Sequence, residues 1–329
     1  MYHNFVPSDF NKFDNNSTKE AFVIIGNAIV FITQYSDKLS FFLAIIGALI
    51  NVFHVFILSK KSMISNVTNL ILLGIAISDI VNLSVFAEKT FFFIYQDACT
   101  LPKSLFITKL LNFLEFMKDD SRRLSTWFGV LMASLRYLIL KNALNPNFEY
   151  LSKPSSGWKS LAIAFFISTL MSMFYLFRVE IVSKVWIIPA IVLPILAALL
   201  IRELKKAEVS RKKMSVSSQS SNNSDNTSKL VIIMTITCIC AEGPMGIAFV
   251  IEGLVAASAL RLLVIYFQSI LFTFVILNAT THFFVCLGVS TPYRRAVKEL
   301  LGYKKSQKPV NLFENVTFNK YYHTDTSGC

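Results

Sequence analysis

Ionisable residues with the potential for chemistry lie inside long apolar runs of this sequence. The densest group is Lys118-Asp-Asp-Ser-Arg-Arg123, and Glu242 is the single charged residue of the apolar run 230–251. Such groups are costly in an apolar environment, so each must face a partner, a cavity or water. No nucleophile–base pair and no metal-ligating cluster stands at catalytic spacing, so we expect neither an enzyme nor a cofactor.

The charged group 118–123 can be interpreted in two ways. Arg123 precedes Arg136 by 13 residues, or about 20 Å along a helix. If one helix runs through the group, its charges lie in the outer half of a bundle, where they could bind a charged ligand or be neutralised by Glu242. If the group is a loop, the apolar span begins at Leu124. In the first case the candidate ligand-binding residues are Asp119, Arg122, Arg123 and Glu242.

A second set of polar residues lies near the middle or inner half of other apolar runs: Asn51, Asp79, Asn278 and His282. For any one of them, the simpler interpretation is a hydrogen-bond network that holds helices together. Their similar depth also allows a polar relay that repacks on activation, with a sodium ion as a possible ligand of Asp79.

Two further positions could couple movement to the inner side. Arg136, followed by Tyr137, closes the third apolar run. Taken alone, it is typical of a flanking arginine that reaches the lipid headgroups. Pro244 follows Glu242 and Gly243, and it removes a backbone donor, so it predicts a kink. That kink is either a bend set by packing or a hinge.

The composition indicates which kind of protein must position these residues. Of 329 residues, 54% are hydrophobic and 16% are charged, against about 25% charged in average soluble domains. There is too little polar surface to cover the cores of a soluble two-domain enzyme. A net charge of +12 in a membrane protein is typical of basic residues beside the inner face, so we expect no nucleic-acid partner.

Seven apolar runs predict an all-α bundle of membrane-spanning helices, since about 20 apolar residues cross the hydrocarbon core. The predicted spans are residues 39–58, 67–87, 106–140, 158–177, 185–201, 230–251 and 262–287. The apolar stretch Ala21–Ile32 is too short to be another span. We interpret it as an interfacial helix or as an outward extension of the first span.

Charge predicts the orientation of this bundle in the plasma membrane. With the N-terminus outside, the inner segments hold 20 Lys and Arg and the outer segments hold 9, as the positive-inside rule requires. Residues 1–38 are then extracellular, 39–287 form the bundle, and 288–329 form an amphipathic helix and a cytoplasmic tail. Asn15 and Asn16 head sequons on the outer side and are candidate glycosylation sites.

The segment after the seventh span predicts an amphipathic eighth helix on the inner leaflet. In Ser290–Leu301, a helical wheel places Tyr293, Val297, Leu300 and Leu301 on one face, and basic residues elsewhere. Such a helix suits an anionic lipid surface.

Motifs in several spans, taken together, resemble those of rhodopsin-like G-protein-coupled receptors. They include Asn51, Ala76-Ile-Ser-Asp79, Leu135-Arg136-Tyr137, Pro244 and Asn278-x-x-x-His282-Phe-x-x-Cys286. Further motifs resemble nematode serpentine chemoreceptors of class W, a family related to FMRFamide-type peptide receptors, over about residues 40–302. They are Asn51-x-x-His54, Gly74-Ile-Ala-Ile-Ser-Asp-Ile80, Ser125-Thr-Trp127, Ala241-Glu-Gly-Pro-Met-Gly-Ile247 and Ser290-x-x-Tyr-Arg294.

The resemblance implies a receptor that passes an extracellular chemical or neuropeptide signal to a heterotrimeric G protein. It implies that Arg136 and Tyr137 couple to the G protein, that Pro244 is the hinge, and that Asp79 belongs to the relay. Two alternatives stay open. A transporter or channel would use the intramembrane charges as a relay and would carry current or solute without a G protein. A shortened, non-signalling receptor would fail to reach the cell surface.

Overall fold

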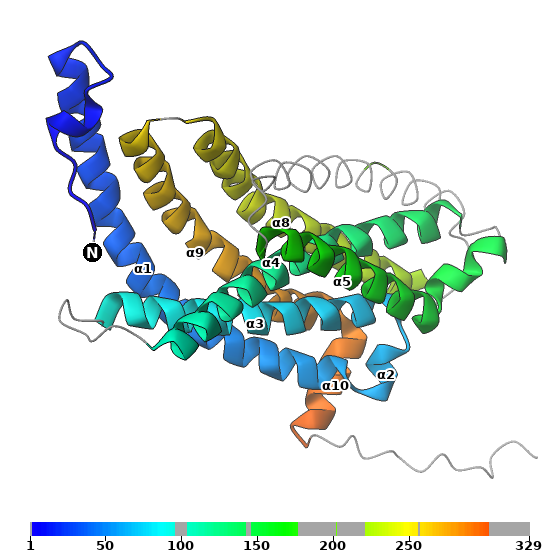
Figure 1. The fold of residues 1–329 in the computed structure, drawn as a ribbon. Helices are drawn as coiled ribbons and strands as arrows, with labels where there is room; N and C mark the ends of the chain where they lie inside the picture. The colour runs from blue at the N-terminus through cyan, green and yellow to red at the C-terminus, as the bar shows by residue number, and fades with distance from the viewer. Residues whose placement is uncertain are drawn as a thin grey trace, which may run out of the picture.

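A computed structural model describes residues 2–95, 104–142, 146–176, 202, 221–255 and 257–302. All regular structure in these residues is helical (Figure 1), which confirms the all-α prediction. The helices are η1 (Pro7–Phe10), α1 (Asn16–Leu58), α2 (Lys61–Ile64), α3 (Val67–Tyr95), α4 (Leu105–Lys141), η2 (Pro146–Ser152), α5 (Pro154–Leu176), α8 (Ser221–Leu254), α9 (Ser258–Val289) and α10 (Thr291–Leu300). The predicted fifth span, 185–201, and the tail after residue 302 lie outside the described residues.

Within the described residues, four helical segments are long and apolar enough to cross a membrane. They are Asn16–Leu58, Val67–Phe92, Lys229–Leu254 and Ser258–Val289. These segments carry large exposed apolar side chains such as Phe42, Phe56 and Phe274. Lipid tails can cover such surface as readily as a protein core can, so exposure of this kind is typical of a membrane helix.

Helix α1 is longer than the predicted first span because it runs without a break through Ala21–Ile32. Asn15 caps it by accepting a hydrogen bond from the backbone N–H of Ser17 at 2.9 Å. Its 43 residues extend over about 64 Å, roughly twice the hydrocarbon thickness of a bilayer. Of the two interpretations of residues 21–32, the structure therefore agrees with an extension of the first span and not with a separate helix.

Helix α4 runs through the charged group 118–123, so the structure has the continuous helix and not the loop. The Ser104 side chain caps its start by accepting from the backbone N–H of Ile107. A helix can hold these charges because several of them are buried against α5 and α8, as shown below. This continuity decides where the candidate ligand residues point.

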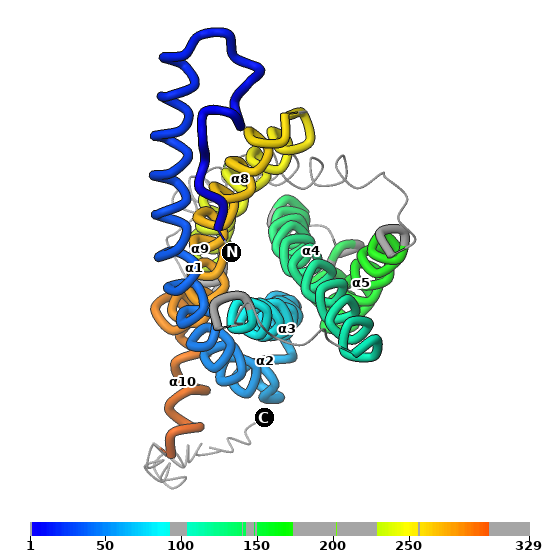
Figure 2. The backbone as a smooth tube through the Cα atoms, turned by 60° about the vertical axis from the view of Figure 1, so that its left-hand side comes forward, coloured from blue at the N-terminus to red at the C-terminus, as the bar shows by residue number. Residues whose placement is uncertain are grey.

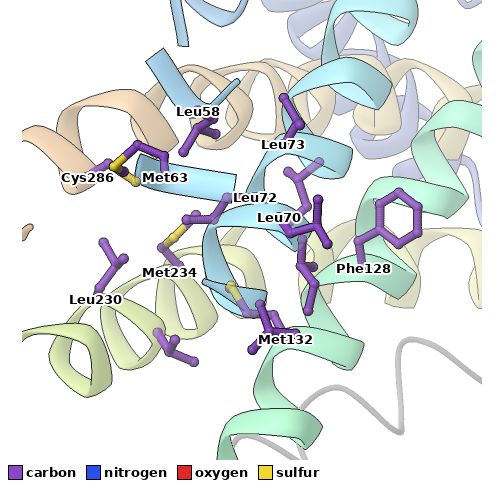
Figure 3. Close-up of a cluster of buried hydrophobic side chains, with 14 of the residues drawn as sticks. Leu58, Met63, Leu70, Leu72, Leu73, Phe128, Met132, Leu230, Met234 and Cys286 are labelled. Atoms are coloured by element: carbon purple, nitrogen blue, oxygen red, sulfur yellow. The ribbon is translucent and has the colours of Figure 1, made fainter. Parts of the chain in front are cut away.

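The largest buried apolar cluster lies where α3, α4 and α8 meet (Figure 3). Leu72 of α3, Met132 of α4, and Leu230 and Met234 of α8 belong to it, and each is at most 2% exposed. Helix α1 packs along α3 and α9, and α9 in turn packs along α8. These contacts fix the polar side chains on α3, α4, α8 and α9 relative to one another.

Helix α10 packs against α1, α2 and α9, and it buries Tyr293 and Ala296. Leu300 is 41% exposed at the far end of the helix, whereas Arg294 and Lys298 are exposed on its other faces. The predicted apolar face is therefore half covered by the protein, and its last turn is bare.

Candidate functional site

Asp79 lies at the centre of a polar cluster formed by α3, α4 and α9. Its Oδ1 accepts a hydrogen bond of 2.8 Å from the hydroxyl of Ser125, and its Oδ2 lies 3.3 Å from Nδ1 of His282. Both Asp79 and His282 are buried. A carboxylate at this depth needs polar neighbours, and here one oxygen accepts a hydrogen bond while the other lies close to an imidazole nitrogen.

Asn51 ties α1 to α9 beside this cluster. Its Nδ2 donates to the carbonyl of Gly47 at 3.0 Å and to the carbonyl of Ala279 at 3.2 Å. The helices can approach because Gly47 has no side chain: a Cβ there would lie 2.6 Å from Oγ1 of Thr280. A small residue at a close helix crossing and an amide that bonds across it are typical of membrane bundles.

A small cavity lies between α3, α4, α8 and α9. Its polar lining includes Ser125, Thr235, Glu242, Asn278 and His282. Its volume of about 40 Å³ has room for about three water molecules. Among the described residues, the buried Oδ1 of Asn278 has no hydrogen-bond partner, so a water or ligand in the cavity could satisfy it.

Arg122 and Glu242 converge from α4 and α8. The guanidinium carbon of Arg122 lies 5.1 Å from the ring centroid of Phe249, and Arg122 interacts electrostatically with Glu242. Arg122 is buried, and the half-buried Glu242 lines the cavity. The structure therefore brings these two predicted ligand residues to one place.

Arg123 faces α5 instead. Successive residues of a helix point about 100° apart, so Arg122 and Arg123 have different neighbours. Arg123 donates to the hydroxyl of Ser172, and its Nη2 lies 3.9 Å from Oδ1 of Asp120. Asp119, the other predicted ligand residue, is half-buried. The four predicted residues thus do not form one cluster.

Asp120 is a buried residue of this region that sequence analysis did not single out. Its Oδ1 accepts from the hydroxyls of Ser168 and Ser172 at 2.7 and 2.6 Å, and its Oδ2 lies 3.3 Å from the hydroxyl of Thr169. The i, i+3 spacing of Asp120 and Arg123, together with serines four residues apart at 168 and 172, was the available signal. This network satisfies the charges of α4 by hydrogen bonds from α5.

The predicted coupling residues lie in the last turns of α4. Arg136 is half-buried, and among the described residues its buried Nε has no hydrogen-bond partner. Tyr137 is also half-buried, and the ammonium of Lys141 lies 5.5 Å from its ring centroid. Pro244 is exposed inside α8, and the helix continues past it to Leu254.

A buried contact between α1 and α10 also had no role assigned from the sequence. The Nδ1 of His54 and the hydroxyl of Tyr293 lie 2.5 Å apart, and each residue is 1% exposed. Phe283 of α9 packs edge-on against both rings. Through this contact α10 is held directly by the membrane-spanning part of α1. Asn15 and Asn16, the candidate glycosylation sites, are exposed.

In the described residues, no group of three His, Cys, Asp or Glu side chains could hold a metal ion. A sodium ion at Asp79 stays a prediction.

Comparison with known proteins places this arrangement in a family. The family model described as serpentine type 7TM GPCR chemoreceptor Srw matches residues 38–187 and 181–304. No curated protein matches the sequence. The matched residues include the Asp79 cluster, the α4–α5 network and all of α10. The chain therefore belongs to the Srw family of serpentine seven-transmembrane GPCR chemoreceptors.

Proposed function

We propose that the protein is a seven-helix plasma-membrane receptor that passes an extracellular chemical or neuropeptide signal to a heterotrimeric G protein. The N-terminus is extracellular, the C-terminus is cytoplasmic, and residues 185–201 supply the fifth span. Membership in a chemoreceptor GPCR family supports the receptor class. The excess of basic residues in the inner segments supports the orientation.

The observation that carries the ligand site is the electrostatic interaction of Arg122 with Glu242, which lines the cavity. A charged group on the ligand would take the place of one residue of this pair and interact with the other. The described cavity has about 40 Å³, so the ligand must widen it or bind above it. Arg123 and Asp119 are proposed to support this site and not to touch the same ligand group.

The signal is proposed to travel as a shift between two populated arrangements of the bundle. The Asp79, Ser125 and His282 side chains join three helices below the ligand site, and Asn51 and Asn278 complete the relay. The inner part of α8 would swing at Pro244 and part from Leu72 and Met132. Arg136 and Tyr137 would then contact the G protein.

A ligand screen on cells that express this chain with a promiscuous G protein tests the proposal. Arg122→Ala and Glu242→Gln should each raise the half-maximal ligand concentration at least ten-fold at equal surface expression. The matched control is Lys109→Ala, which removes one exposed charge from the same helix α4 and should leave the response unchanged. Unchanged responses in both site variants would refute the ligand site.

The alternative of a transporter or channel draws its support from the buried contact between Asp79 and His282. Its relay would also need Arg123, whose guanidinium is held against α5. Ligand-dependent current or uptake in cells that lack the G protein would favour this alternative. A chain retained inside the cell would favour the non-signalling variant.

A further inference from the structure

The N-terminal segment Tyr2–Phe13 folds back beside α1 and reaches α9 (Figure 2). Phe5 and Phe10 are each 2% exposed, and they share a buried cluster with Val30 of α1 and Ala259 of α9. The segment has only one short helical turn, so the burial of its two phenylalanines depends on a site formed by residues of α1 and α9. The following contacts define that site.

Asn27 of α1 binds the backbone of Phe5 with both ends of its amide. Its Oδ1 accepts from the N–H of Phe5 at 2.8 Å, and its Nδ2 donates to the carbonyl of Phe5 at 3.2 Å. On the α9 side, the hydroxyl of Tyr266 accepts from the N–H of His3 at 2.8 Å. Contacts to the main chain hold an extended peptide whatever its side chains are.

Gly26 supplies the space for the ring. A Cβ at this position would lie 2.6 Å from Cδ2 of Phe5, so the ring occupies the place of the missing side chain. The ring of Tyr266 stands edge-on to Phe5, with 6.2 Å between centroids. We name this site, made of Gly26, Asn27 and Tyr266, the aromatic notch.

A second contact anchors the start of the segment. The hydroxyl of Tyr2 donates to Oδ2 of Asp37 at 2.7 Å, while the hydroxyl of Ser269 in α9 donates to Oδ1 of the same carboxylate. Burial, and then the carboxylate of Asp37, raise the pKa of Tyr2. The phenol therefore stays protonated and keeps its hydrogen bond throughout the neutral range.

On the proposed topology, with the inner membrane boundary at the end of α1, the notch lies beyond the hydrocarbon core. Gly26 precedes Leu58, the last residue of α1, by 32 residues, or about 48 Å, against a hydrocarbon core of about 30 Å. That it faces the outside medium rests on the proposed topology. A peptide in that medium could therefore reach it.

We propose that the aromatic notch is a binding site for one aromatic residue of an extended peptide. In the structure, the chain's own N-terminal segment occupies the site. An extracellular peptide with an aromatic residue competes with that segment. The notch is separate from the pair of Arg122 and Glu242, and its occupant is read by backbone bonds and ring shape, not by charge.

Binding of a fluorescent synthetic peptide with the sequence of residues 2–13 tests the proposal on the full-length receptor in membranes. A background variant with Phe5→Ala and Phe10→Ala empties the ring site of the notch and leaves the segment held by its backbone bonds alone. This vacated variant should bind the peptide at least ten-fold more tightly than the wild type. Adding Gly26→Leu or Asn27→Ala to this background should weaken binding at least ten-fold. Adding Ile25→Ala, a neighbour whose side chain is exposed, should change nothing.

Equal binding to the wild type and the vacated variant, or binding that Gly26→Leu leaves unchanged, would overturn the proposal. Limited proteolysis gives a second readout, and its variants keep the native sequence of residues 2–13. Gly26→Leu and Asn27→Ala alone should each speed cleavage within residues 2–13 about ten-fold, and Ile25→Ala should not. Equal cleavage rates would equally overturn it. Neither readout needs a G protein, so failure here is distinct from failure of the proposed signalling.

Discussion

At the scale of single residues, we expect the contact between Asp79 and His282 to stabilise the polar cluster. Loss of either partner leaves the other buried without its counterpart, which is costly in a bundle core. We predict that Asp79→Asn and His282→Gln each lower the stability of the detergent-solubilised protein. The double variant should lose less than the sum of the two losses, by about 0.5–3 kcal/mol.

Reversible unfolding in detergent measures this coupling. The control combines Asp79→Asn with His3→Gln. His3 lies in the N-terminal segment and forms hydrogen bonds with Asp9 and Tyr266, not with the Asp79 cluster. These two losses should add. Full additivity for Asp79 and His282 as well would show that their contact contributes nothing.

The carboxylate of Asp9 is expected to make the fold of the N-terminal segment dependent on pH. A hydrogen bond from the backbone N–H of Val6, and then one from His3, lower the pKa of Asp9. A group with a lowered pKa in the folded state stabilises that state above its unfolded pKa, here about 3.9. The contribution is lost as the pH falls through the folded pKa.

Proteolysis of residues 2–13 should therefore accelerate only below about pH 4, measured with an acid-stable protease. The variant Asp9→Asn should lack this acceleration because its amide does not titrate. A wild-type rate that stays constant down to pH 2, or an identical profile in the variant, would disprove the role of Asp9.

At the scale of elements, the interface of α4 and α5 depends on Asp120. Its carboxylate accepts hydrogen bonds from Ser168 and Ser172 and lies beside Arg123. Asp120→Ala should therefore cost about 3–5 kcal/mol, since it leaves Arg123 buried without its carboxylate. Asp119→Ala, one position along the helix, should cost about 1 kcal/mol or less.

Surface expression and thermal stability of the two variants measure this difference. The pair is matched, because each substitution removes one carboxylate from neighbouring positions of the same helix. Equal losses would mean that the serines of α5 do not single out Asp120.

Much of the element layout is predictable from sequence, because hydropathy is a local property. The apolar runs predict α3, α9 and the last part of α8 well. The continuity of α4 through 118–123 is not predictable in this way, because charges inside an apolar helix are tolerated only when another helix supplies their partners. Those partners, Ser168 and Ser172, lie about 50 residues further along the chain.

The candidate site shows the same limit. Sequence alone indicates that Arg122, Arg123 and Glu242 need partners, but it does not say which arginine faces which helix. That depends on the rotation of α4 in the bundle, which packing against α5 and α8 sets. The contact between His54 and Tyr293 likewise joins residues 239 positions apart, and only the fold brings them together.

At the scale of the whole molecule, the two ends of the bundle differ in what they contain. The N-terminal segment and the extended part of α1 form one end, and the cluster around Leu72, Met132 and Met234 lies far along the helices from it. A receptor must place these ends on opposite sides of the membrane. Every role proposed for Arg122, Pro244 and Arg136 depends on that placement.

Epitope tags at the two termini of the full-length chain test this claim most directly. In intact cells, an antibody should bind the N-terminal tag, and it should bind the C-terminal tag only after the membrane is permeabilised. Both tags on the same side of the membrane would mean an even number of spans, and that result would contradict the account of this protein as a seven-helix receptor.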